Sequence, residues 1–489
     1  MKRVSPGVVR AALITLSGFV LLYLTAQLVL FDAQSDAWTV QVAVLSMILI
    51  IGQFGLLRLY FGTIYLFSNI FVISIAVFHL GYVVLDATGW QPIEAFHKGD
   101  MAIWYQSAGW YICLAIASFL LGAAIGLRKR GLYQDSPLQI KHNMQRMFAM
   151  GNGVLLASLF GIVLLINTVG NIFLYSRQQL YAGIGDMRGL GLVLAILPTG
   201  LIMLACCATT RMERTWAYAC AFLATVLILF LGERSYVMFP LLTGAVIWHK
   251  LGRKIPKVVA AVGIAVAVFV IPVISILRSL GPYAELESRH LRDAVEHGNV
   301  KSAVMEVGGV LTLVGNVIRW VPEEEPYRVG ETYAKAMLEI VPNVGLSNSR
   351  STRAEAKKML GGMTIDPRSL RPADWYIFKI NRWMFEHGGG SGFSIIAEAY
   401  MNFGLAGVVF VFIMLGILLM KLDLKDLRYD YIALFCAIVF IWPLLKTVRN
   451  DILSFVKPVS LCLWTVLIWQ LFSYFLPSTR RHMTVARQP

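Results

Sequence analysis

The sequence predicts an all-α polytopic integral membrane protein with about 12 transmembrane helices and one large extracytoplasmic helical loop. Two observations lead to this fold class. Hydrophobic residues make up 57% of the 489 residues and charged residues only 15%, whereas soluble domains contain about 25% charged residues. Apolar runs of bilayer-spanning length recur on both sides of one polar, arginine-rich stretch, 278–396. The whole chain, 1–489, is therefore expected to be one membrane domain.

Nine apolar runs precede the polar stretch, within 9–277, and three follow it, within 397–476. In lipid, each backbone N–H and C=O group must be hydrogen-bonded within its own segment, so each run is expected to form one helix. The first run starts at Arg10 without a small-residue cleavage site, which indicates a retained span and not a signal peptide. The expected spans are 9–30, 38–57, 65–86, 106–127, 147–168, 189–210, 216–231, 236–249, 257–277, 397–420, 431–446 and 453–476.

Lys and Arg are distributed unevenly between the two sets of connecting segments. With the N-terminus in the cytoplasm, the inside segments hold 21 of these residues and the short outside loops hold six. This excess predicts an N-in, C-in orientation, with a cytoplasmic tail at 477–489 and the large loop, 278–396, in the periplasm. The net charge of +15 is mostly this topological signal, so it does not indicate nucleic-acid binding.

The large loop is expected to form short helices that lie on the membrane. Apolar residues from 304 to 318 recur at steps of three and four, which predicts a helix that ends at Val321-Pro322. The sequence at 352–355 has capping-box spacing and predicts a second helix start. Aromatic and basic residues alternate over 374–387, as in a helix of the headgroup region, and the glycines at 388–390 then lead into the tenth span.

Signatures of nucleotide, metal and serine-hydrolase chemistry are absent from the sequence. It has no P-loop, no GxGxxG after a strand, no HExxH and no Gly-x-Ser-x-Gly. All six cysteines fall within expected spans, so the outside loop lacks thiols for disulfides or for a zinc site. We therefore expect neither a metal nor a cofactor.

Basic residues at membrane depth on the outer side are the main indication of chemistry. Arg234 lies in a tight turn between two short spans, where an ionisable side chain is costly and indicates function. Arg278 closes the ninth span, and snorkelling at a helix end would explain it equally well. Arg449 is close to Asp451 in the last outside turn, where a structural ion pair is the alternative. Several arginines in one pocket would suit a diphosphate, whose oxygens match the guanidinium group.

Several motifs on the outer side recur in a known family. They are GERS at 232–235, MEVG at 305–308, TL at 312–313, VP at 321–322, YRVGETY at 327–333 and GFSIIAEAYMNFG at 392–404. The stretch that holds them, 232–407, resembles the O-antigen polymerase family, the Wzy-type oligosaccharide repeat-unit polymerases. Asn343, after Val341-Pro342, departs from the family pattern, which has a second proline there.

The resemblance implies a metal-independent glycosyltransferase of the bacterial inner membrane. Such enzymes join oligosaccharide repeats at the periplasmic face, and a repeat carried on undecaprenyl diphosphate serves as donor and as acceptor. Transfer needs positive charge for the departing diphosphate and a base for the acceptor hydroxyl group. A chain-length regulator protein is a further partner that we consider.

Glu398 is the first candidate for the base, since it lies in the first turn of the tenth span, where the helix dipole favours its ionised form. Glu306 is the second candidate and His387 the third. Each has a structural alternative: helix stabilisation for Glu398, a solvated side chain for Glu306 and a helix end for His387. Tyr400 and Asn402 are candidates for sugar contacts. The candidates for diphosphate binding are Arg234, Arg278, Arg350, Arg353, Arg382 and Arg449.

Three other functions compete with the polymerase. An O-antigen ligase would share the layout but transfer the chain to a lipid core. A polyprenyl-linked sugar transferase often has a carboxylate in its first outside loop, where Asp32 and Asp36 stand here, although that loop is short. A transporter or flippase should show two repeated halves, whereas the one large loop of this chain lies off-centre. We rank the polymerase first, the ligase second and the transporter third.

Overall fold

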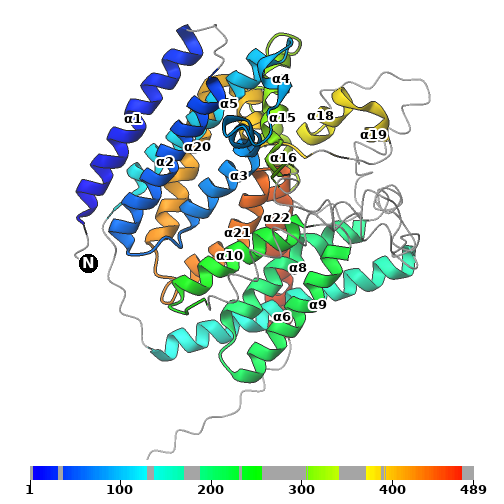
Figure 1. The fold of residues 1–489 in the computed structure, drawn as a ribbon. Helices are drawn as coiled ribbons and strands as arrows, with labels where there is room; N and C mark the ends of the chain where they lie inside the picture. The colour runs from blue at the N-terminus through cyan, green and yellow to red at the C-terminus, as the bar shows by residue number, and fades with distance from the viewer. Residues whose placement is uncertain are drawn as a thin grey trace, which may run out of the picture.

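The structure is a computed structural model (Figure 1). It describes residues 4–30, 37–128, 137–169, 188–230, 234–255, 304–305, 307–340, 370–386, 390 and 392–475. Every regular element within these ranges is an α-helix. The helices are α1 (Pro6–Leu30), α2 (Trp38–Phe61), α3 (Phe67–Ala87), α4 (Glu94–His97), α5 (Ala102–Gly126), α6 (Pro137–Val169), α8 (Arg188–Cys207), α9 (Arg211–Phe230), α10 (Ser235–Lys250), α15 (Val310–Trp320), α16 (Glu331–Leu338), α18 (Pro372–Ile380), α19 (Arg382–Glu386), α20 (Ile395–Leu424), α21 (Tyr431–Thr447) and α22 (Leu453–Phe475).

Eleven of the twelve expected spans coincide with a helix, namely α1, α2, α3, α5, α6, α8, α9, α10, α20, α21 and α22. The twelfth, 257–277, lies outside the described residues. Eight of the described helices are long and apolar enough to cross a membrane over all or most of their length: α1, α2, α3, α5, α6, α9, α20 and α22. These helices confirm an all-helical, polytopic membrane fold, while the number of 12 spans stays a prediction.

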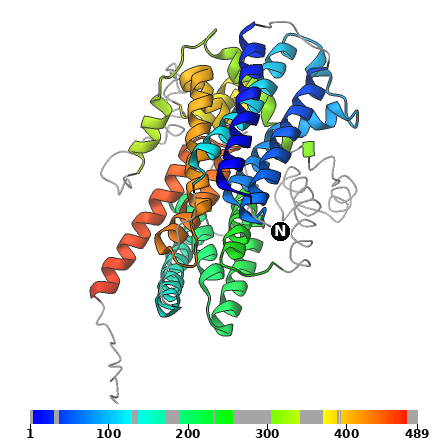
Figure 2. The same ribbon diagram turned by 90° about the vertical axis from the view of Figure 1, so that its left-hand side faces the viewer.

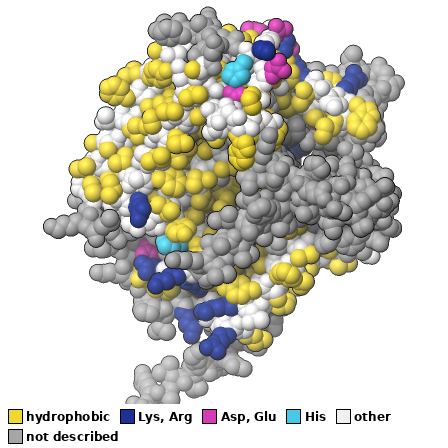
Figure 3. Space-filling view, in the orientation of Figure 1, with side chains coloured by type: hydrophobic (Ala, Val, Ile, Leu, Met, Phe, Trp, Pro, Cys, Tyr) yellow, Lys and Arg dark blue, Asp and Glu magenta, His cyan; other side chains and the backbone are white. Residues whose placement is uncertain are grey.

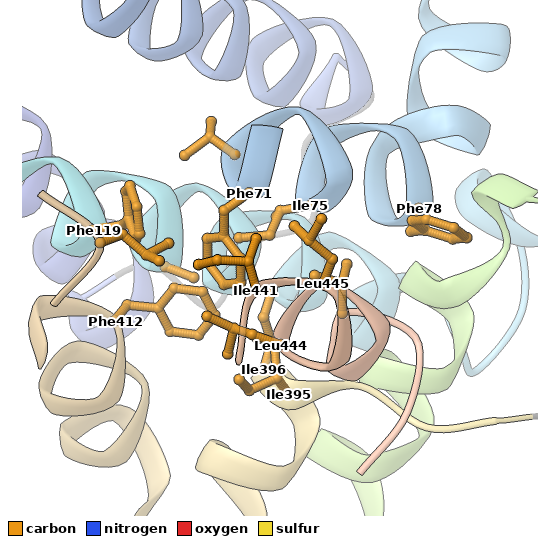
Figure 4. Packing of buried hydrophobic residues seen from close by; sticks show 14 of the residues in the cluster. Phe71, Ile75, Phe78, Phe119, Ile395, Ile396, Phe412, Ile441, Leu444 and Leu445 are labelled. Atoms are coloured by element: carbon orange, nitrogen blue, oxygen red, sulfur yellow. The ribbon is translucent and has the colours of Figure 1, made fainter. Parts of the chain in front are cut away.

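The helices pack as two groups (Figures 1 and 2). In the first, α1, α2, α3 and α20 pack around α5, and in the second, α6, α8, α9 and α10 pack with α21 and α22. The groups meet where α3 and α20 touch α21 and where α3 touches α10. Figure 4 shows Leu444 and Leu445 of α21 gathered with Ile395 and Ile396 of α20. An apolar core therefore joins the two groups.

A close approach of α5 and α20 fixes the central helix pair. A Cβ atom on Gly122 would collide with the carbonyl oxygen of Ile413, and one on Gly416 would collide with the carbonyl oxygen of Phe119. Small residues of this kind let membrane helices pack backbone to backbone, where van der Waals contact replaces the hydrophobic effect. The helix that carries Glu398 is thus held firmly against the centre of the first group.

Lys and Arg gather at one end of the helix bundle, which we call the basic end. It holds the C-terminal ends of α2, α5, α10 and α20. The Tyr60 hydroxyl donates to the Arg128 carbonyl at 3.0 Å, and the Lys250 ammonium donates to the Asp423 carbonyl at 2.8 Å. Figure 3 shows dark-blue side chains below a broad apolar surface. The opposite end, with α4, α15, α16 and α18, is called the loop end.

The helix predicted from the apolar stripe at 304–318 is present as α15, and it ends before Val321 as expected. It begins later than the stripe, because the chain turns at Gly309. Just before this turn, Gly308 passes close to α3, and a Cβ atom on it would lie 2.6 Å from the Cα atom of Gly81. α15 therefore belongs to the packed bundle, since it lies against α3, α5 and α20.

The single helix expected over 374–387 is wrong, because the structure has two helices there, α18 and α19. The backbone leaves helical geometry at Asn381, whose side-chain oxygen then accepts a hydrogen bond from the Met384 backbone N–H at 2.9 Å. α18 packs on α15, with the rings of Trp320 and Trp375 5.5 Å apart. The helix start predicted at 352–355 lies outside the described residues.

Candidate active site at the junction of the helix groups

α20 is broken near the loop end, at Phe403 and Gly404. Phe403 has φ −141° and ψ 16°, and Gly404 has φ 61° and ψ −144°, a positive φ that favours glycine. The break separates a short half-helix, 395–402, from the segment 405–424. That segment alone is long enough to cross about 30 Å of hydrocarbon. The half-helix, 395–402, is therefore not needed to cross the membrane.

The segment 327–333 provides the hydrogen bonds that the broken helix lacks. In a continuous helix, the carbonyl groups of Met401 and Asn402 would accept from N–H groups four residues later. Here they accept from the backbone N–H groups of Arg328 and Val329, at 3.0 Å each. Irregular backbone at membrane depth is tolerated only where the protein satisfies its polar groups. These bonds therefore hold 327–333 on the outer part of α20.

Asn402 fastens the same segment with its buried side-chain amide. Its Nδ2 donates to Thr332 Oγ1 at 2.7 Å and to the Glu398 carbonyl at 2.8 Å, and its Oδ1 accepts from Gly330 N at 3.0 Å. The amide thus orders the chain at the start of α16. The sugar contact expected of Asn402 stays a prediction.

Glu398 lies in the half-helix with no exposed surface. Its Oε2 accepts a hydrogen bond from the backbone N–H of Ile452 at 2.7 Å, which joins the half-helix to the turn before α22. Its Oε1 has no hydrogen-bond partner within 3.5 Å in the described part of the chain. Asp451 and Arg328 lie close enough to interact with the carboxyl group electrostatically, and the Thr332 hydroxyl lies beside it. A buried carboxylate oxygen without such a partner calls for an explanation, and a catalytic role is one.

A second buried carboxyl group, that of Asp451, lies beside Glu398. Its Oδ2 accepts from the backbone N–H of Ala373, at the start of α18, at 3.4 Å. Arg371 donates from Nε to Asp374 at 2.7 Å and also lies within electrostatic range of Asp451. The turn before α22 is therefore the point where α18 and the half-helix of α20 meet.

Tyr333 of α16 brings a phenol group close to the same carboxyl group. Its hydroxyl is buried and, among the described residues, has no hydrogen-bond partner. Burial raises the pKa of Tyr333 above its ordinary value, and the carboxylate of Glu398 raises it further. The phenol is therefore neutral at physiological pH and can donate a hydrogen bond. Tyr333 and Glu398 together offer a donor and an acceptor to a substrate hydroxyl group.

Arg328 places a guanidinium group next to these carboxyl groups. Its side chain is buried, its Nη1 donates to the Leu370 carbonyl at 3.1 Å, and it lies 5.3 Å from the centre of a Trp375 ring. The sequence reasoning did not select Arg328 as a site residue. The available signal was the motif at 327–333, in which Arg328 is the one arginine.

Basic side chains gather around Tyr236 at the loop end of α10 and α21. Arg234 immediately precedes α10 and is half-buried. The Lys446 ammonium lies 3.7 Å from the centre of the Tyr236 ring, and the Arg449 guanidinium lies 5.9 Å from the ring of Phe78 on α3. The structure thus places two predicted arginines, Arg234 and Arg449, where α3, α10 and α21 meet, and it adds Lys446.

The other candidates are less informative. Arg382 is exposed on α19, 5.5 Å from the Phe378 ring. Tyr400 is buried, with its ring 5.0 Å from Tyr111 and 6.0 Å from Tyr327. The binding roles of Arg382 and Tyr400 stay predictions. Five candidates lie outside the described residues: Arg278, Glu306, Arg350, Arg353 and His387.

The family model of the O-antigen polysaccharide polymerase Wzy matches residues 9–478. The chain belongs to this family. The match confirms the resemblance seen in the motifs, and it covers both helix groups and every site residue described above. Membership in the Wzy family makes the chain an O-antigen repeat-unit polymerase, a multi-pass membrane protein of polysaccharide biosynthesis. No curated protein and no solved structure matches the chain.

Proposed function

We propose that this Wzy-family chain moves a growing oligosaccharide from undecaprenyl diphosphate onto a hydroxyl group of a second lipid-linked repeat. The acceptor oxygen forms a bond to the anomeric carbon of the donor sugar, and the bond from that carbon to the diphosphate oxygen breaks. The acceptor proton passes to Glu398, and the diphosphate leaves with the electron pair. The buried Glu398 carboxyl group, with one oxygen unpartnered among the described residues, is the observation that carries this proposal.

We further propose that the reaction needs no metal ion, because Arg234 and Arg449 stabilise the departing diphosphate. Guanidinium groups stay charged at all physiological pH values and bind phosphate oxygens in pairs. In the ranges that the structure describes, His, Cys, Asp and Glu do not gather in threes as metal ligands would. The proposal of a metal-independent reaction is supported by Arg234 and Arg449, which lie where α3, α10 and α21 meet.

We also propose twelve spans with both termini in the cytoplasm, so that the loop end, with 278–396, faces the periplasm of a bacterial inner membrane. Lys and Arg at the basic end support this orientation. α10 and α21 are short, about 25 Å each. α10 nevertheless reaches from Tyr236 at the loop end to Lys250 at the basic end, so it is counted among the twelve spans.

A chain-length regulator protein stays a proposed partner.

Glu398→Gln tests the proposed base. Glutamine keeps a side-chain oxygen for the Ile452 N–H group but cannot take the acceptor proton, so transfer is expected to slow about 10²–10⁴-fold. The measurement is the polysaccharide ladder in a strain that lacks the native gene, with the amount of membrane protein determined in parallel. Glu331→Gln is the matched control, because Glu331 is 44% exposed and pairs with Lys335 on the surface of α16.

The expected result is single-repeat material without a ladder for Glu398→Gln and a normal ladder for Glu331→Gln. A normal ladder from Glu398→Gln would show that Glu398 only stabilises its helix, which is worth about 0.3–1 kcal/mol. The base would then be sought at Glu306. Deletion of the gene separates the alternatives: a polymerase mutant keeps single repeats on the lipid core, a ligase mutant loses them, and a flippase mutant retains lipid-linked repeats inside.

A further inference from the structure

Lys446 stands at the loop end of α21, and its ammonium has no acceptor among the described residues. The residue is 9% exposed, and the ammonium lies 3.7 Å from the centre of the Tyr236 ring. Within the described part of the chain, no carboxylate lies within 4.0 Å of this ammonium, and no oxygen accepts its hydrogen bonds. An ammonium group without an acceptor costs free energy to the extent that it is shielded from water.

The structure offsets only part of this burial. The face of Tyr236 attracts a cation, and the C-terminal end of α21 favours positive charge. Neither feature accepts the ammonium's hydrogen bonds. The backbone carbonyl of Lys446 is already used, since it accepts from Arg449 N at 3.2 Å and from Asn450 Nδ2 at 3.3 Å.

A second buried lysine, at the basic end, shows what is missing at Lys446. Lys250 has a side chain 7% exposed, and its ammonium donates to the Asp423 carbonyl at 2.8 Å and lies 3.5 Å from the Asp423 carboxylate. Both lysines stand in the last turn of a helix and both lie near an aromatic ring. Among the described residues, one buried lysine therefore has an anion beside it and the other does not.

The surroundings of Lys446 lead to the proposed base. Arg234 lies two residues before Tyr236 in the sequence, at the same end of α10. Arg371 lies within electrostatic range of both Tyr236 and Asp451, and Asp451 is the carboxyl neighbour of Glu398. Arg371 therefore links the ring on which Lys446 rests to the carboxyl groups of the site.

We propose that Lys446, held on the ring of Tyr236, binds the diphosphate of the lipid-linked substrate through N–H···O bonds to its non-bridging oxygens. This inference rests on the proposed function and adds a binding residue to it. The diphosphate provides both the negative charge and the acceptors that the described residues do not. Tyr236 acts as a positioning residue, because its ring fixes where the ammonium lies.

Binding of undecaprenyl diphosphate to the full chain in phosphatidylcholine nanodiscs tests the proposal. Lys446→Met keeps the apolar stem and removes the charge, and it is expected to weaken binding about 10- to 100-fold. Lys446→Arg keeps the charge and should retain most of the affinity. Lys335→Met is the matched control, since Lys335 is 46% exposed on α16, and it should bind as the unaltered chain does. Unchanged binding by Lys446→Met would overturn the proposal.

Thermal unfolding without ligand separates binding from a structural role. Because an unpartnered buried charge destabilises the fold, Lys446→Met should unfold at the same temperature or higher. A clearly lower unfolding temperature would mean that Lys446 supports the fold, and the proposal would fail. Phosphatidylglycerol is the second probe: if it competes as strongly as undecaprenyl diphosphate, the site binds general lipid headgroups and the assignment to substrate is wrong.

The binding assay also distinguishes this proposal from the proposed base. Glu398→Gln should bind undecaprenyl diphosphate normally while it fails to polymerise. If Glu398→Gln polymerises normally and Lys446→Met still loses binding, the base is wrong and the lysine site stands. If Glu398→Gln fails to polymerise and Lys446→Met binds normally, the lysine site is wrong and the base stands.

Discussion

Gly404→Ala tests whether the break in α20 holds the active site together. At φ 61° and ψ −144°, alanine is strained by about 1–3 kcal/mol. The added Cβ atom would also lie 3.0 Å from the Tyr327 hydroxyl oxygen and 3.2 Å from its ring, and overpacking of this kind costs about 1–3 kcal/mol. If the break persists, we expect the free energy of unfolding to fall by about 2–6 kcal/mol.

The variant can avoid this strain only if α20 closes into a continuous helix. The carbonyl groups of Met401 and Asn402 would then bond within α20 and release the N–H groups of Arg328 and Val329. Each lost hydrogen bond is worth about 0.5–1.5 kcal/mol, and Arg328 would no longer be held beside Glu398. Both outcomes therefore reduce activity, the first through stability and the second through geometry.

The assay compares the thermal unfolding temperature of purified protein with the polysaccharide ladder in a deletion strain. Gly244→Ala in α10 is the control, because no atom lies within 4 Å of the added Cβ atom and alanine favours a helix interior by about 1 kcal/mol. We expect Gly404→Ala to unfold at a lower temperature or to lose its ladder, and Gly244→Ala to keep both. A Gly404→Ala protein with a normal unfolding temperature and ladder would refute the role of the break.

Two further predictions concern charge and topology. Arg234→Ala is expected to abolish polymerisation of purified lipid-linked repeats. Arg234→Lys should restore only part of it, because lysine lacks the guanidinium fork. Full activity of the lysine variant would show that the fork is not needed. The reaction should also continue in chelator, and a loss that added divalent metal reverses would show that a metal takes part. Single cysteines at Ser288 and Ser369, in a chain without its six native cysteines, should react with an impermeant thiol reagent in intact spheroplasts. Labelling only after lysis would reverse the orientation.

Helix positions were predictable because the length of an apolar run is a local property of the sequence. Eleven expected spans therefore coincide with helices. Breaks were not predictable from hydropathy, since Phe403-Gly404 lies within a run that is apolar on both sides. The break at Asn381, between α18 and α19, was not predictable either, because the aromatic pattern continues across it. The new helix starts there because the Asn381 side chain accepts a hydrogen bond from the Met384 N–H group.

The site was predictable in part. Glu398 was selected because it opens a span, and the structure gives it a buried position in the half-helix. Its neighbours Arg328, Asp451 and Tyr333 come from segments far apart in sequence, and only tertiary packing brings them together. Lys446 stands at the end of an expected span, where sequence reasoning counted it only as an outside charge. Its burial against Tyr236 depends on the contact between α10 and α21.

Stability and activity depend on the same hydrogen bonds at the break in α20. The N–H groups of Arg328 and Val329 satisfy the backbone that the break exposes, as a membrane interior requires. The same bonds set the position of the Arg328 side chain and, through Asn402, that of Thr332 beside Glu398. Substitutions that break these hydrogen bonds, such as Thr332→Val, should therefore lower stability and activity together. Lys446 lies outside this network, so its substitution should reduce substrate binding while the unliganded fold keeps its stability, and this difference identifies it as a residue that serves the ligand.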